Sequence, residues 1–197
     1  MSRIKCALGL AALAVSASAE AGVVTTSSQS AFNLITTSRA YVRESFAFTA
    51  PGAYSSLAGG TAWNAWSMSA GSSGLEVAGG RARAADAGAT ITITFAPGSV
   101  FGVGGNFFMS NDAGGPASQV RIALASGQSY VANSSATSFA GFVSTEAITS
   151  ITIQRQVAGA DPQFATVGSL VVAGVPAPGS VACLAAAGLV GSRRRRR

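Results

Sequence analysis

The chain has 197 residues, of which 48% are hydrophobic and 10% are charged, and its formal net charge is +6. The positive charge belongs to the two ends of the sequence. Residues 20–174 hold six arginines and seven carboxylates, so this body carries a net charge of −1. Because no basic region remains there to neutralise phosphates, the composition argues against a nucleic-acid partner.

Histidine is absent, and the two cysteines, Cys6 and Cys183, lie outside residues 20–174. This composition excludes histidine zinc sites, histidine-dependent catalytic triads and disulfides in the body. The seven carboxylates are scattered along the sequence, with no close pair suited to glycoside hydrolysis. We therefore expect neither an enzyme nor a cofactor, and a domain that is stabilised by its hydrophobic core alone.

Residues 1–19 have the three parts of a secretory signal peptide. Arg3 and Lys5 precede an apolar run over 6–17, and the small residues Ala17 and Ala19 fit the rule for cleavage after Ala19. Cleavage after Ala21 is the alternative. The segment predicts export, with signal peptidase as the processing partner.

The body begins with the Ser/Thr-rich residues 22–38, which we expect to be loose. A strand is predicted over 39–52, and this segment closes with a Pro-Gly turn. Its apolar face consists of Val42, Phe46 and Phe48. Residues 60–74 fit either a pair of strands or an irregular loop.

The clearest strand signal lies at 89–98, where the sequence ATITITFAPG alternates strictly between apolar residues and threonines. A period of two places Ile91 and Ile93 on one face, so this segment is typical of a half-buried strand. Similar patterns follow along the chain. Further strands are predicted over 99–110, 118–127, 128–133, 138–144, 147–157 and 167–174.

Many short strands separated by turn residues predict an all-β domain over residues 20–174, with the antiparallel β-sandwich or jelly roll as its architecture. Helices are expected only at the two ends, as an N-terminal signal helix and a C-terminal single transmembrane helix. The predicted core residues are Ile91, Ile93, Val120, Ile122, Ile151 and Ile153. Thr92, Arg121 and Thr152 are expected to face solvent.

Two short stretches of the body offer candidates for ligand binding. Asn111 and Asp112 would supply oxygen ligands to a calcium ion, although the same residues are common in turns. Trp63 or Trp66 would offer an exposed ring on which a sugar stacks, and core packing is the alternative. Their spacing of three puts them on opposite faces of a strand, so at most one would be such a platform. The glycines within residues 102–107 favour close strand packing rather than phosphate binding.

The sequence ends in a proline pair, a short apolar run and an arginine cluster. As a helix, residues 175–192 would span about 27 Å, close to the roughly 30 Å of a bilayer core. The apolar helix itself is assigned to 180–192. The positive-inside rule keeps the arginines in the cytoplasm, and the prolines keep the chain extended just outside the membrane.

This tail, residues 175–197, resembles the PEP-CTERM sorting signals of bacterial exosortase substrates, in its VPAPG variant. Ala177 stands where that family usually has glutamate. The matching sorting motif consists of Val175, Pro176, Ala177, Pro178 and Gly179. The matching stop-transfer cluster consists of Arg193, Arg194, Arg195, Arg196 and Arg197.

The resemblance implies an exported protein that is held transiently in the inner membrane, cleaved by an exosortase-type enzyme, and released to the cell surface or the extracellular space. The expected role is structural or adhesive, in the envelope or the extracellular matrix, where polysaccharide is a further expected partner. A carbohydrate-binding β-sandwich module is the alternative function, and a glycan-active enzyme is the third.

Overall fold

The structure is a computed structural model that describes residues 22–37, 40–133, 135–157 and 161–174. The predicted signal peptide (1–19) lies outside the described residues, as does the whole tail with its predicted sorting motif, predicted transmembrane helix and arginine cluster. Within the described ranges, no helix is long and apolar enough to cross a membrane.

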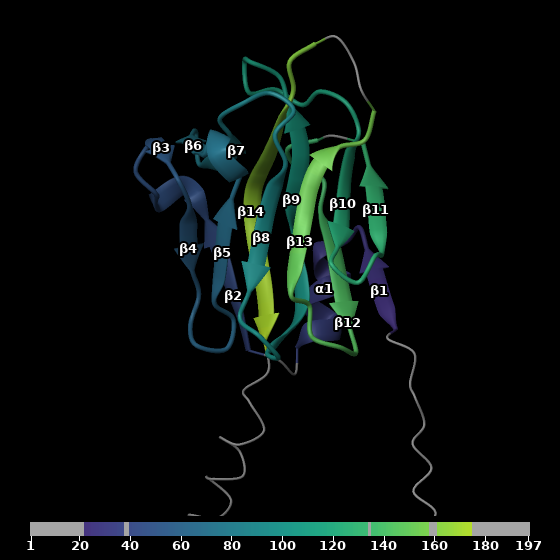
Figure 1. Cartoon of the computed structure of the whole chain (residues 1–197). Helices are drawn as coiled ribbons and strands as arrows, with labels where there is room; N and C mark the ends of the chain where they lie inside the picture. The colour runs from purple at the N-terminus through teal and green to yellow at the C-terminus, as the bar shows by residue number, and fades with distance from the viewer. Residues whose placement is uncertain (1–21, 38–39, 134, 158–160, 175–197) are drawn as a thin grey trace, which may run out of the picture.

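The described residues form an all-β body of two antiparallel sheets that face each other as in a β-sandwich (Figure 1). The first sheet has the order β1 (Val23–Thr26), β12 (Ala140–Ser144), β9 (Val100–Ser110), β14 (Phe164–Gly174), β7 (Arg81–Ala84), β6 (Leu75–Ala78) and β3 (Gly52–Tyr54), and β2 (Ala40–Ser45) also pairs with β14. The second sheet has the order β11 (Ser129–Ala132), β10 (Val120–Leu124), β13 (Ser150–Arg155), β8 (Ile91–Phe95), β5 (Trp66–Ser69) and β4 (Leu57–Gly59).

The strands from β7 to β14 pair like one long hairpin that has been rolled up. β10 pairs with β11 at its tip, and then β9 pairs with β12, β8 with β13, and β7 with β14. Successive strands of this hairpin lie in alternate sheets, except for β10 and β11, which share the second sheet. The longest strands, β9 and β14, therefore lie side by side in the middle of the first sheet.

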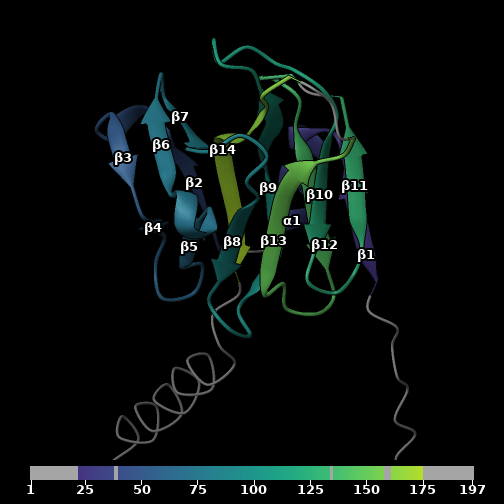
Figure 2. The same cartoon turned by 45° about the horizontal axis from the view of Figure 1, so that its top comes forward.

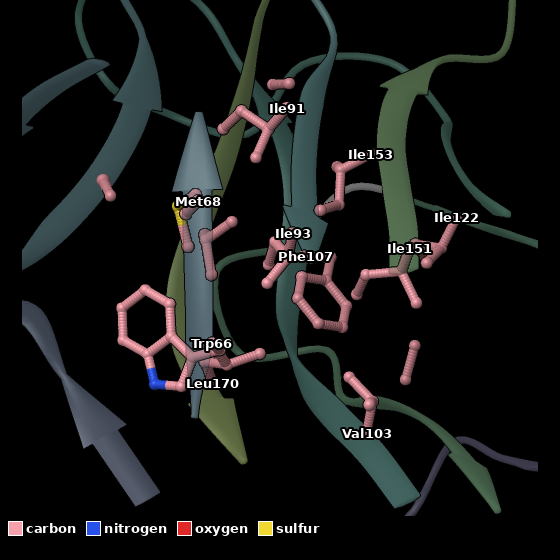
Figure 3. Close-up of a cluster of buried hydrophobic side chains, with 14 of the residues drawn as sticks. Trp66, Met68, Ile91, Ile93, Val103, Phe107, Ile122, Ile151, Ile153 and Leu170 are labelled. Carbon is pink, nitrogen blue, oxygen red and sulfur yellow. The ribbon is translucent and has the colours of Figure 1, made fainter. Parts of the chain in front are cut away.

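The core lies between the two sheets and contains the predicted isoleucines (Figure 3). Ile91, Ile93, Ile151 and Ile153 are fully buried, as are Val120 and Ile122. The alternation in β8, β10 and β13 is confirmed, with half-buried Thr92, Arg121 and Thr152 on the opposite face. From the first sheet, Val103, Phe107 and Leu170 contribute to the same core.

The expectation that residues 22–38 are loose is wrong. They form β1 and an eight-residue helix, α1 (Gln29–Thr36), so helical structure is not restricted to the two ends of the chain. Ser28 caps this helix by accepting a hydrogen bond from the amide of Ala31. Phe32 buries the helix against the outer face of the first sheet, in a small second cluster with Phe139, Val143, Val171 and Ala173. Figure 2 shows α1 behind this sheet.

The predicted strand over 39–52 is interrupted. β2 ends at Ser45, and a 3-10 turn, η1 (Phe46–Phe48), places Phe46 in the core. Residues 60–74, for which the sequence fits either a pair of strands or an irregular loop, contain a loop, β5 and a second 3-10 turn, η2 (Gly71–Ser73). The hairpin of β6 and β7 was not predicted, because its inward side chains include the small Ala82 and Ala84.

The described chain begins and ends at one end of the sandwich, which we call the tail end (Figure 1). The pairing register places Val24, Val143, Gly102 and Ala173 in one row across four strands. The tail end also includes the loop at 60–65, since the amide of Ala96 donates to the carbonyl of Ala65. Connections 85–90 and 111–119 lie at the opposite end, together with residues 156–157 and 161–163, and we call this the far end.

Candidate functional site

A groove of about 420 Å³ opens on the outer face of the first sheet, towards the far end. It lies between β7, the last residue of β9 and the turn at 111–115. We call it the arginine groove. Its lining consists of Ala78, Gly79, Arg81, Arg83, Ser110, Asp112, Ala113, Gly114 and Thr166.

The alternation of β7 explains why two arginines meet in this groove. Ala82 and Ala84 are fully buried in the core, so Arg81 and Arg83 project from the opposite face. Positive φ angles at Gly79 and Gly80 allow the tight turn from β6 into β7. The alternating pattern Arg-Ala-Arg-Ala is the one sequence signal that could have revealed the pair.

Both guanidinium groups lie over aromatic rings of the neighbouring strands. The Cζ atom of Arg81 is 5.3 Å from the ring centre of Phe108, and that of Arg83 is 4.8 Å from the ring centre of Phe164. These cation–π contacts restrict how the arginines move. The groove is therefore lined by two planar guanidinium groups whose movement is restricted.

The two arginines differ in what remains available for a ligand. Arg83 is paired with Glu76, with Nε at 2.8 Å and Nη2 at 2.6 Å from the same carboxylate oxygen. Arg81 donates from Nη1 to the carbonyl oxygen of Gly114 at 3.0 Å, and no carboxylate of the described residues lies within ion-pairing distance of it. Arg81 is thus the group in this groove that is best able to bind an incoming acceptor.

The predicted metal candidates, Asn111 and Asp112, are neighbours in the turn at 111–115. The side-chain oxygen of Asn111 accepts a hydrogen bond from the amide of Gly115 at 2.9 Å, so it closes the turn. Asp112 lines the groove. Among the described residues, no three side chains of His, Cys, Asp or Glu gather in a way that could hold a metal ion.

The two tryptophans lie in different environments. Trp66 is 5% exposed and packs edge-to-face on Phe46, with ring centres 6.3 Å apart, so it offers no face to a sugar. Trp63 is 42% exposed and lies in the loop at 60–65. That loop is held by Asn64, whose side-chain oxygen accepts from the amide and the hydroxyl of Thr61. A sugar platform would therefore rest on Trp63 alone, at the tail end.

The glycines of residues 102–107 fit closely against neighbouring groups. A Cβ atom on Gly104 would overlap the ring of Phe139, and one on Gly105 would overlap the carbonyl oxygen of Ser169. On the helix side, a Cβ on Gly102 would lie 3.2 Å from the methyl group of Thr36. These residues serve close packing, as the sequence predicted.

No protein-family model matches the chain, and no curated protein is significantly similar to it in sequence.

Proposed function

We propose that this chain is an exported structural or adhesive protein of the cell envelope or extracellular matrix, and that an exosortase-type enzyme processes its C-terminal tail. The observation that carries the proposal is the position of the two described termini. Gly22 bonds to Thr145 beside β12, and β14 ends at Gly174, so both termini lie at the tail end.

This arrangement suits a domain that is attached to a membrane at both ends during export. Val24 and Ala173 lie in one row, separated by β12 and β9. Three strand spacings correspond to about 14 Å. A signal peptide before Gly22 and a tail after Gly174 would thus reach the same bilayer while the rest of the body projects away from it.

The proposed sorting motif, Val175 to Gly179, follows directly after the last residue of β14. Pro176 and Pro178 disfavour both helix and central strand, so the motif would be an extended segment between the folded body and the membrane. The helix over 180–192 and the cytoplasmic arginines would hold the chain there until cleavage.

The intact mass of the mature protein, measured separately in the inner-membrane, cell-surface and secreted fractions, tests this proposal. We expect the surface or secreted form to begin at residue 20 or 22 and to end within or near residues 175–179. A surface or secreted form that still ends in Arg197 would contradict the sorting function and make the tail a plain anchor.

We further propose that the body is a jelly roll, because the strands from β7 to β14 form a rolled hairpin whose halves alternate between the sheets. Jelly rolls occur among lectins, but that likeness concerns the fold alone. The second candidate function, a carbohydrate-binding module, is favoured by the arginine groove.

Glycan-array binding tests the second candidate. Arg81→Gln should abolish binding of any glycan that uses the groove, because it removes the unpaired cation. Arg121→Gln is the matched control, since Arg121 projects from the second sheet. Binding that survives Arg81→Gln but is lost in Trp63→Ala would move the sugar site to the loop at 60–65.

A further inference from the structure

The exposed large apolar side chains of the described residues are unevenly distributed. There are six, and four of them lie at or next to the tail end: Val24, Leu34, Ile35 and Trp63. The remaining two, Val131 and Val157, lie on β11 and in a far-end connection. We call the first four residues the apolar rim.

Backbone contacts fix the position of the rim. Val24 pairs with Val143 in the row that also contains Ala173. The last turn of α1, which contains Leu34 and Ile35, descends to this row, because Thr36 lies against Gly102. On the other side, a Cβ atom on Gly174 would overlap the carbonyl oxygen of Trp63. The rim therefore surrounds the point where β14 ends.

Charge is distributed in the opposite sense. The described segments of the tail end, which are α1, β1, the start of β2 and the connections at 60–65, 96–99, 125–128 and 145–149, hold two charged residues, Arg43 and Glu146. Three of the far-end connections carry an aspartate, namely Asp86, Asp112 and Asp161, and the strand ends beside them carry Arg83, Arg121 and Arg155. Charged side chains are thus few at the tail end and more numerous, with both signs, at the far end.

From this distribution we infer that the apolar rim docks on the lipid bilayer to which the tail is attached. This inference rests on the proposed function, because it takes the segment after Gly174 as membrane-inserted. That segment continues directly from β14 with prolines, an uncharged run and five arginines, so it would bring the bilayer to the rim and to no other surface.

The chemistry of the rim suits the boundary between lipid headgroups and acyl chains. An indole ring is apolar over most of its surface but carries an N–H donor, so tryptophan favours this region of a membrane. Leucine, isoleucine and valine gain from the removal of their apolar surface from water.

Docking would hold the body upright on the bilayer and fix the height of the segment after Gly174. A body that is attached by its tail alone would tilt freely about that segment. The rim would thus present the sorting motif at a constant distance from the membrane surface. This is a role in positioning the substrate segment, and it needs no catalytic group from this chain.

The test uses the full chain, including residues 175–197, reconstituted in vesicles of phosphatidylethanolamine and phosphatidylglycerol, with or without lipids brominated near the headgroup end of the acyl chain. Flotation with the vesicles measures insertion of the tail. Quenching of tryptophan fluorescence by the brominated lipid measures contact of Trp63 with the bilayer. Trp66, which is buried in the core, supplies an unquenched background.

We expect a loss of fluorescence in brominated vesicles that disappears in Trp63→Phe and is weakened in the double variant Leu34→Ser/Ile35→Ser. The matched control is Val131→Ser/Val157→Ser, which changes the exposed apolar residues outside the rim and should leave quenching unchanged. Because all these positions are exposed, the urea unfolding midpoint should be nearly the same in every variant.

Three results would overturn the inference. A chain that floats with the vesicles while Trp63 is not quenched would show that the body does not dock, and would leave the membrane step of the proposed function intact. A chain that does not float would contradict both the docking of the body and the membrane step of the proposed function. Protection of Trp63 from a water-soluble quencher, without quenching by the brominated lipid, would show that a second copy of the chain covers the rim.

Discussion

The ring of Phe139 lies against Gly104 so closely that a Cβ atom at position 104 would overlap its Cζ atom and come within 3.2 Å of both Cε atoms. Phe139 in turn meets Phe32 of α1 edge-to-face, with ring centres 5.6 Å apart. Phe32 of α1 thus packs on Phe139, and Phe139 packs on the backbone of β9, so these contacts hold the helix on the first sheet.

We predict that Gly104→Ala destabilises the body by about 1–3 kcal/mol, the usual cost of adding a methyl group to a closely packed site. Gly168→Ala is the matched control, because a Cβ there would meet Asn106 and Phe108 at ordinary distances of 3.5 and 3.6 Å. Urea unfolding measures both variants. In Phe139→Ala the overlap is gone, so adding Gly104→Ala should cost much less. An equal cost in both backgrounds would refute the overlap.

The register of the second sheet makes a further prediction. Ile151 is fully buried, so Ile151→Ala should lower the free energy of unfolding by about 2–5 kcal/mol. Thr94, on neighbouring β8, is exposed, so Thr94→Ala should change it by about 0.5 kcal/mol or less. Chemical denaturation compares the two variants. Similar costs at both sites would mean that the faces of these strands are assigned the wrong way round.

A third prediction concerns the independence of the body. A fragment of residues 22–174 should fold cooperatively without metal or disulfide, and a chelator should not change its unfolding midpoint. A fragment of residues 22–163 should not fold, because it lacks β14, which pairs with β2, β7 and β9. Near-ultraviolet circular dichroism distinguishes the two, and native-like spectra from the shorter fragment would contradict the prediction.

The tail gives two variants with opposite outcomes. Replacing Arg193, Arg194, Arg195, Arg196 and Arg197 by serine should let the full-length chain leave the inner membrane uncleaved, because five arginines are costly to move through a bilayer and halt export. Replacing Pro176 and Pro178 by alanine should leave the chain uncut in the inner membrane. Fractionation and intact mass measure both, and normal cleavage in either variant would contradict the assigned role of the replaced residues.

The strands that the sequence predicted share one property: their inward positions hold large or branched apolar residues. Ile91 and Ile93 in β8, and Ile151 and Ile153 in β13, are separated by residues that can face water, so the period of two is plain in the sequence. In β6 and β7 the inward positions include Ala82 and Ala84, and so the alternation is too weak to recognise from the sequence alone.

Residues 22–38 were misjudged for a different reason. Their serines and threonines suggested a loose segment, yet Ser28 caps a helix and Thr36 bonds back to the carbonyl of Phe32. The helix is short and is stabilised by the packing of Phe32 on glycines of β9 and β12, which are more than sixty residues away in the sequence. Tertiary contact of this kind outweighs local propensity.

The arginine groove could not be derived from the sequence because its parts come from distant segments. Arg81 and Arg83 are on β7, Ser110 ends β9, Asp112 is in a turn, and Thr166 is on β14. Only the pairing of β14 with both β7 and β9 brings these side chains together. The sequence placed Asp112 near a turn but contained no sign that a guanidinium group would lie beside it.

The place of β14 in the first sheet also sets the order of events when the protein is made. A ribosome produces this strand after every other strand of the body, although it is the one that β9, β7 and β2 need as a neighbour. Until it emerges, the first sheet remains divided and the chain has no complete core. If the chain passes through a secretion channel that accepts only unfolded proteins, it would therefore remain unfolded until β14 has been made. Folding would then coincide with the arrival of the tail at the membrane.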